Sequence, residues 1–254
     1  MSQMKLKVGL KDWTRGTNIL ELDVPPQLET TVPTGIGFFD DALSSKEGIT
    51  PSSSILLTGT PGAGKTTLCL QLADAITKSG NVCLYNTGEE SLLQVRKVAK
   101  RLRLQHGFIA GQDTHVPTLL EHAGSLMKAN PGRQLFMVID SLAVLDDGFY
   151  ANGHTNSMST VRAIEMLTDF CKETYAIGIT IGQVNKAGEF AGKQQIKHAV
   201  DVHAHLALDL QKSSETYGER IFEVQKNRFG ANGKRYVLGM GKDGLYEKGH
   251  FETV

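Results

Sequence analysis

Residues 59–67 read GTPGAGKTT, and their types and spacing suggest phosphate chemistry. They fit the pattern GxxxxGK(S/T), directly after an apolar run and directly before a stretch of good helix formers. Glycines let the backbone fold around a phosphate, so that successive N–H groups and the positive end of the next helix face the anion. Lys65 would then reach the β and γ phosphates, and the Thr66 hydroxyl would ligate Mg²⁺. The predicted nucleotide-binding residues are Gly59, Thr60, Pro61, Gly62, Ala63, Gly64, Lys65, Thr66 and Thr67.

A second segment, LFMVIDS at 135–141, ends an apolar run on a carboxylate. It would deliver Asp140 to the carboxyl end of a strand, where open α/β sheets bind their ligands. An aspartate after an apolar run is also typical of a turn or a helix cap. Its place downstream of a phosphate loop favours a role in holding Mg²⁺ through the water shell of the ion. The predicted metal residues are therefore Thr66 and Asp140.

A third segment, CLYNTGEES, places Glu89 and Glu90 just past the second expected strand. ATP hydrolysis needs a group that orients or deprotonates water, and neighbouring carboxylates disfavour each other's charge, which suits a base. The alternative is a charge pair at a helix N-terminus, where acidic residues are favoured. A glutamate one strand away from the phosphate loop distinguishes particular ATPases from GTPases and small-molecule kinases, so we predict ATP as the nucleotide and a catalytic role for this pair of glutamates.

These residues need a sheet that brings several strand ends together. From residue 30 onward, strand-like and helix-like runs alternate, which predicts an α/β fold with a mainly parallel central sheet and helices on both faces. The expected strands are 54–58, 82–86, 135–139, 176–182 and 202–208. The expected helices are 65–79, 91–104, 116–129 and 158–175. After residue 208 the pattern predicts a C-terminal antiparallel extension with strands 220–226 and 235–240 around the turn-forming NRFGANG.

Composition narrows the class of protein further. The chain has 254 residues, 40% of them hydrophobic and 21% charged, which suits one full-sized core. We predict an ATPase core at 30–254 and an extension or linker arm at 1–29, which Pro25 and Pro26 stiffen. No apolar run approaches the length that crosses a membrane, and the N-terminus lacks an apolar signal-peptide core, so we expect a cytoplasmic location and no membrane partner. Three widely separated cysteines are expected to be reduced core residues.

The net charge is zero, so bulk electrostatics does not predict nucleic-acid binding. Any such binding would depend on local loops, multiplied by assembly of several copies.

Several longer stretches carry a resemblance to a known family. They are TGIGFFDDALSSKEGITPSSSILLTGTPGAGKTTL, LYNTGEESLLQVRKVAKRL, VIDS, IGQVNKAGEFAG followed by HAVD, and QKNRFGANGKRYVLGM. With these stretches, residues 30–247 resemble the RecA-like P-loop ATPases, most specifically the RadA (Sms) family of bacterial DNA-repair proteins. The KNRFG string is the most specific of them. Helicases of the DnaB type and the KaiC ATPases share the core but do not match all of the stretches.

The resemblance implies roles for individual residues. Glu89 falls where the family has its catalytic glutamate, and Gln183 matches a sensor of the γ phosphate. Lys226 and Arg228 of KNRFG look like cations that reach the nucleotide of a neighbouring subunit, where they would stabilise phosphoryl charge. Without the family match, this segment would be read as a solvated hairpin turn. We therefore expect the chain to assemble with further copies, because these two cations have no evident work inside one subunit.

Two segments match the loops with which this class grips single-stranded DNA in a central channel: 146–159 and 186–197. The first offers Phe149 and Tyr150 for stacking on bases, and the second carries Lys186, Lys193 and Lys197 for phosphate contacts. Ordinary surface loops are the alternative.

The sequence also departs from the RadA pattern, because no four-cysteine zinc site precedes the core and no Lon-protease-like domain follows it. We expect a stripped motor. A metal site at His198, Asp201, His203 and His205 is less favoured than a structural or intersubunit role. For Arg96 we predict either a position over the adenine of the nucleotide or a solvated position on a helix.

We predict a Mg²⁺-dependent ATPase that forms a ring, most simply a hexamer, on single-stranded DNA and drives translocation or branch migration in recombination and repair. A recombinase or replication protein is an expected further partner. The alternatives are a DnaB-type helicase motor and a KaiC-like switch that works without DNA; a filament is the alternative to a ring.

Overall fold

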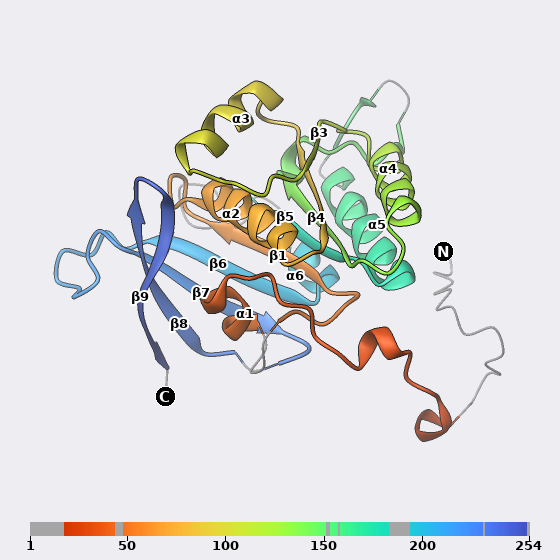
Figure 1. The fold of residues 1–254 in the computed structure, drawn as a ribbon, viewed down its shortest axis with the longest axis horizontal. Helices are drawn as coiled ribbons and strands as arrows, with labels where there is room; N and C mark the ends of the chain where they lie inside the picture. Colours follow the sequence, from red (N-terminus) through yellow and green to blue (C-terminus); the bar gives the residue numbers. More distant parts are fainter. Residues whose placement is uncertain are drawn as a thin grey trace.

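The computed structural model describes residues 18–43, 48–150, 153–156, 158–182, 194–230 and 232–252. Its strands form one nine-stranded sheet in the order β3-β2-β4-β5-β1-β6-β7-β8-β9 (Figure 1). The strands are β1 (Ser54–Gly59), β2 (Val82–Thr87), β3 (Ile109–Gly111), β4 (Leu135–Asp140), β5 (Ile177–Ile181), β6 (Val202–Leu208), β7 (Arg220–Asn227), β8 (Lys234–Gly241) and β9 (Gly244–Glu252).

The first six strands of the chain are parallel to one another, whereas β7, β8 and β9 add to the edge at β6 as antiparallel strands. The predicted fold class is therefore confirmed, including the C-terminal antiparallel extension. Two strands were not predicted. The short β3 carries no clear pattern, while β9 begins at the glycine of Asp243-Gly244, a dipeptide that favours a tight hairpin.

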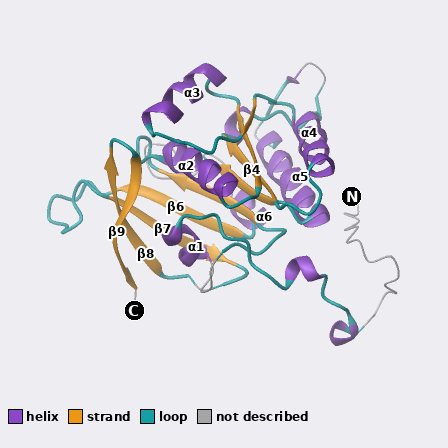
Figure 2. Cartoon of the chain, viewed as in Figure 1, coloured by secondary structure: helices purple, strands orange, loops and turns teal. Residues whose placement is uncertain are grey.

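Helices cover both faces of the parallel part of the sheet (Figure 2). They are α1 (Gly37–Leu43), α2 (Lys65–Lys78), α3 (Leu92–Arg101), α4 (Val116–Ala129), α5 (Ser159–Thr174) and α6 (Gln194–Ala199), with short 3-10 turns η1 (Ile19–Glu21), η2 (Pro26–Leu28) and η3 (Leu142–Val144). The four predicted helices agree with α2, α3, α4 and α5 to within a few residues. α1 and α6, at seven and six residues, are too short for a clear periodic signal.

Alternation along the buried strands builds two separate cores. Ile55 and Leu57 of β1 pack with α1, α2 and α3, while Leu56 between them packs with α4, α5 and α6. Because successive strand side chains point to opposite faces, a strand buried on both sides needs an unbroken apolar run. The runs seen in the sequence have this form.

The N-terminal described segment has a different character. Its two turns, η1 and η2, contain no buried residue, and the segment runs away from the sheet in Figure 1. The boundary at residue 29 stays a prediction. Among the described residues, no helix is long and apolar enough to span a membrane.

Candidate functional site

The phosphate loop joins the end of β1 to the start of α2. Gly62 and Gly64 adopt positive φ angles of 76° and 105°, which turn the chain sharply before the first helical residue. At Gly59 the backbone passes so close to β6 that a Cβ would lie 1.9 Å from the carbonyl oxygen of Leu206. The loop is therefore bare backbone at the N-terminus of a 14-residue helix, which is the arrangement that attracts an anion.

Lys65 opens α2 and folds back over the loop. Its Nζ donates to the carbonyl oxygens of Gly59 at 2.9 Å and Thr60 at 3.1 Å. Burial lowers the pKa of Lys65, and the nearby Asp140 carboxylate opposes that change. The ammonium group is thus held at the mouth of the loop, where a phosphate would meet it.

Asp140 ends β4 and lies against the same loop. The Thr66 hydroxyl donates to Asp140 Oδ2 at 2.8 Å, and the phenol of Tyr85 donates to the same oxygen at 2.9 Å. Burial raises the pKa of Asp140, while the two hydrogen bonds lower it. A carboxylate and a hydroxyl in contact beside the phosphate loop are hard oxygen donors of the kind that Mg²⁺ prefers, so the residues present fit this ion.

Glu89 completes the pocket. Its carboxylate accepts a hydrogen bond from the hydroxyl of Ser141, the residue after Asp140. A cavity of about 230 Å³ lies between these groups, and it is lined by Gly59, Pro61, Lys65, Thr66, Glu89, Asp140 and Ile181. Glu90, the neighbour of Glu89 in the sequence, does not line this cavity. The structure thus distinguishes the two adjacent acids.

The sequence did not point to Ile181, which lines the cavity. It also did not point to Tyr85 and Ser141, whose hydroxyl groups donate to Asp140 and Glu89. Tyr85 is fully buried within β2, and a buried tyrosine needs a partner for its hydroxyl, so an isolated tyrosine in an apolar strand was a usable signal. Ser141 carried no signal beyond its place next to Asp140.

Lys226 and Arg228 occupy the opposite edge of the sheet. Arg228 N donates to the carbonyl of Asp201, which precedes β6, and the Asp201 carboxylate accepts from the backbone of Ser54 at the start of β1. The length of β1 from Ser54 to Gly59, about 16 Å, therefore separates this edge from the phosphate loop.

Both cations have partners within their own chain. Arg228 pairs with Asp201 at 3.0 Å, and Lys226 Nζ donates to the carbonyls of Lys197 at 2.9 Å and Val200 at 2.5 Å. The expectation that they have no work inside one subunit is wrong, because the C-terminal end of α6 presents carbonyl oxygens to them. One argument for action on the nucleotide of another subunit remains: both cations lie far from the phosphate loop of their own chain.

The other predicted residues lie elsewhere. Phe149 is 66% exposed, and the guanidinium of Arg162 lies 4.5 Å from its ring centroid. Tyr150 packs edge-on against Phe149, with centroids 5.0 Å apart. Arg96 is exposed on α3, and Lys197 is half-buried on α6. Gln183, Lys186 and Lys193 lie outside the described residues.

The histidines on β6 share a strand face with each other. Thr58 Oγ1 lies 2.8 Å from His203 Nε2 and 2.9 Å from His205 Nδ1. No group of three or more potential metal-ligating side chains occurs in the described ranges.

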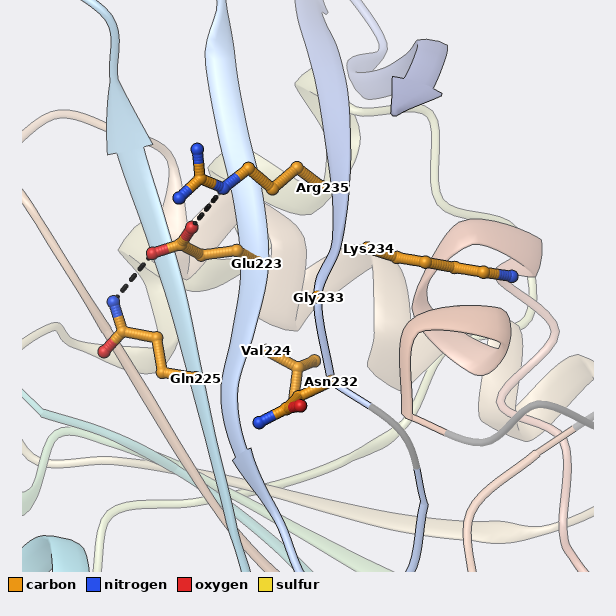
Figure 3. A pocket seen from close by; sticks show the side chains of 7 residues that line it. All are labelled: Glu223, Val224, Gln225, Asn232, Gly233, Lys234 and Arg235. Carbon is orange, nitrogen blue, oxygen red and sulfur yellow. Dashed lines mark hydrogen bonds and ion pairs between the residues drawn. The ribbon is translucent and has the colours of Figure 1, made fainter. Parts of the chain in front are cut away.

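A separate cavity of about 340 Å³ opens between β7 and β8 (Figure 3). Three of its polar side chains are already paired, since Glu223 contacts Arg235 at 2.8 Å and Gln225 at 2.7 Å. Lys234 points away, toward Asp41. None of the residues predicted to do chemistry lines this cavity.

Comparison with known proteins agrees with the fold and the pocket. The family model for the KaiC ATPase matches residues 32–109. Among solved structures, a DnaB-like replicative helicase superposes with a TM-score of 0.71 at 18% identity, covering 84% of this chain and 60% of that one. A KaiC-like protein of Pyrococcus horikoshii gives 0.68 at 21% identity, covering 87% and 99%. The fold and the phosphate loop thus define a RecA-like P-loop ATPase.

Sequence relatives place the chain more narrowly within that class. It is 33% identical to the DNA repair protein RadA of Aquifex aeolicus over 217 residues, covering 84% of this chain and 45% of the relative. It is also 33% identical to RadA of Rickettsia conorii over 247 residues, covering 97% and 52%. The chain matches the ATPase core of RadA, and it spans about half the length of these curated relatives.

Proposed function

We propose that the protein is an ATP-driven motor that acts on single-stranded DNA as a ring of several copies. The observation that carries this proposal is the division of charged groups between two edges of one sheet. Lys65, Thr66, Glu89 and Asp140 meet in one cavity, while Arg228 lies a strand length away. We expect a second copy of the chain to complete this site with its Arg228, as in a motor whose subunits hydrolyse ATP in turn.

The chain's own residues would divide the work on ATP. The phosphate loop and the N-terminus of α2 would bind the phosphates, and Lys65 would exchange its bonds to loop carbonyls for bonds to phosphate oxygens. Glu89, positioned by Ser141, would orient the attacking water and take its proton. Thr66 and Asp140 would hold Mg²⁺, which when bound supplies charge neutralisation at the phosphate oxygens.

Arg228 of the neighbouring copy would stabilise charge on the phosphoryl group. It must first leave Asp201, its partner within one chain. Breaking that pair costs free energy, so hydrolysis would depend on the arrangement of the two copies.

DNA is proposed as the track because the chain matches RadA proteins, which are named for DNA repair, and shares its fold with a DnaB-like replicative helicase. Phe149 and Tyr150 lie beyond the carboxyl end of β4, held by Arg162, and offer aromatic surface for stacking on bases.

The test is ATP turnover with and without single-stranded DNA at low salt. We expect DNA to stimulate turnover, and we expect Lys186→Ala with Lys193→Ala to abolish the stimulation while basal turnover remains. Lys212→Ala, at an exposed loop lysine, is the matched control. Turnover that ignores DNA would refute the motor. It would favour a KaiC-like switch instead, a function that the family match at residues 32–109 also allows.

Mixing variants tests action in trans. Arg228→Ala and Lys65→Ala chains are each expected to be inactive. An Arg228→Ala chain keeps its phosphate loop and can receive Arg228 from a Lys65→Ala neighbour, so the mixture should regain activity. Asp201→Asn is the control, since it removes the ion pair within one chain but leaves Arg228 in place. Absence of recovery in the mixture would remove the trans role.

A further inference from the structure

Helix α3 carries a set of exposed cations, here called the basic face: Arg96, Lys97, Lys100 and Arg101. None of the four makes an ion pair or a side-chain hydrogen bond with another described residue. They form two like-charge pairs at a spacing of four, which disfavours the helix on its own. Leu93, on the same helix, is 78% exposed.

Helix α5 carries the opposite charge on its outer side. Glu165, Asp169 and Glu173 follow one another at a spacing of four and are here called the acidic face. They too lack ion pairs within the described part of the chain. Glu173 is the second-last residue of α5, where the negative end of the helix disfavours an acid. Met166 and Phe170, one residue further on, are half-buried.

The two faces cannot meet within one chain. Val95 of α3 packs into the core that contains α2, whereas Val161 and Leu167 of α5 pack into the core on the other side of the sheet. Figure 1 shows the two helices on different sides of the molecule. Surfaces that are complementary but separate on one molecule favour head-to-tail contact between copies, which closes a ring or extends a filament.

We propose that the basic face of α3 docks on the acidic face of α5 in a second copy of this chain. Charges repeat every four residues on both helices, about 6 Å along each axis, so aligned helices bring opposite charges together. Each face thereby offsets the like-charge repulsion of the other. This inference rests on the assembly in the proposed function and names the surface that it uses.

The proposed contact between α3 and α5 would also explain how Arg228 of one copy reaches the nucleotide of another. α3 begins three residues after Glu89, beside the phosphate pocket. α5 is joined to Arg228 by a chain of hydrogen bonds: Thr168 donates to Ser54, whose N–H donates to Asp201, which pairs with Arg228. Docking α5 of one copy on α3 of another would bring the Arg228 edge of the first toward the Glu89 pocket of the second.

Nucleic-acid phosphate is the other occupant that a basic helix could take. The exposed Leu93 among the cations favours a protein, because interfaces between proteins combine an apolar centre with a polar rim. A phosphate track would also leave the acidic face of α5 without a role.

Charge exchange on the full chain tests the proposal. One variant reverses three of the four cations of the basic face (Lys97→Glu, Lys100→Glu, Arg101→Glu). A second reverses the acidic face (Glu165→Lys, Asp169→Lys, Glu173→Lys), and a third combines both sets. A matched control changes three exposed lysines elsewhere (Lys128→Glu, Lys212→Glu, Lys242→Glu). Sedimentation velocity with a non-hydrolysable ATP analogue and Mg²⁺, without DNA, measures assembly, and circular dichroism checks folding.

We expect each single-face variant to assemble at least about tenfold more weakly than the wild type, with the control unchanged. The combined variant should assemble again, and so should an equimolar mixture of the two single-face variants, in which opposite charges alternate. Assembly of either single-face variant at wild-type strength, failure of both rescues, or a wild type that stays monomeric would overturn the proposal.

Two further outcomes separate this inference from the proposed function. If reversal of the basic face removes DNA binding while assembly persists, α3 is a nucleic-acid surface and the docking proposal fails, although the motor stands. Charge-dependent assembly with turnover that DNA does not stimulate would support the docking and refute the motor.

Discussion

His203 on β6 is expected to make the stability of the fold fall in mild acid. The imidazole is 3% exposed, and its Nε2 lies 2.8 Å from the hydroxyl of Thr58 under the phosphate loop. Burial lowers the pKa of His203 to about 4, because the charged form would lose its hydration. The charged or titratable groups that face it are Lys197, His205, Lys226 and Glu223.

The sign follows from proton binding in the two states. An unfolded histidine has a pKa of about 6.5, so between pH 6.5 and 4 the unfolded chain binds more protons than the folded one, and stability falls as the pH falls. The full difference of about 2.5 pKa units corresponds to about 3 kcal/mol, of which about 2 kcal/mol is lost by pH 5.

The perturbation is His203→Gln, which keeps a polar group near Thr58 but removes the titration. Urea unfolding at pH 7 and pH 5 gives the free energy of unfolding of each protein. The wild type should lose about 2 kcal/mol more than His203→Gln over this interval, since other titrating groups contribute equally to both. His106→Gln, at an exposed histidine, is the control and should behave as the wild type.

Equal pH dependence of the wild type and His203→Gln would refute the reasoning. A second measurement covers the case in which the variant does not fold: the imidazole resonance of His203 in the wild type should stay in its neutral position down to about pH 5. Titration near pH 6.5 would show that the ring is not buried in its neutral form.

Two further outcomes are expected. Gly59→Ala should lower the free energy of unfolding by about 3 kcal/mol, because its Cβ would collide with the Leu206 carbonyl. Gly62→Ala, at a φ of 76° with open space around it, should lower it by only about 1 kcal/mol. Equal losses of stability in thermal melts of the two variants would contradict the close approach of β1 and β6. The three cysteines are buried, and burial raises the pKa of each thiol, that of Cys171 to about 12, so a maleimide should label the protein at pH 7 only after unfolding in guanidinium. Rapid labelling of the native protein would show that a thiol reaches solvent.

Local sequence was sufficient where one segment carries the whole signal. The pattern around Lys65 predicts a turn and a helix start, because glycine adopts positive φ angles without strain and allows the close backbone approach. The runs before Asp140 and Glu89 predicted buried parallel strands, since each run is about as long as one strand and mainly apolar. Both acids accordingly lie at strand ends facing the phosphate loop.

Long-range pairing was beyond the sequence. Asp201 is one residue before a strand and shows no sign of its link to both Ser54 and Arg228, which are far from it along the chain. The expectation that Arg228 lacks a partner in its own chain failed for this reason. The hydrogen bonds of Tyr85 to Asp140 and of Thr58 to two histidines likewise depend on strand order, which short patterns do not encode.

The sequence by itself determined the class of the protein and the residues proposed to bind ATP, because a phosphate loop is built from neighbouring residues whose own types dictate its backbone geometry. The tertiary structure alone decided which edge of the sheet each charge occupies. Packing of the two cores placed Arg228 a strand length from the phosphate loop. It also placed the charged side chains of α3 and α5 on opposite faces of the sheet, so these charges cannot pair with each other within one chain.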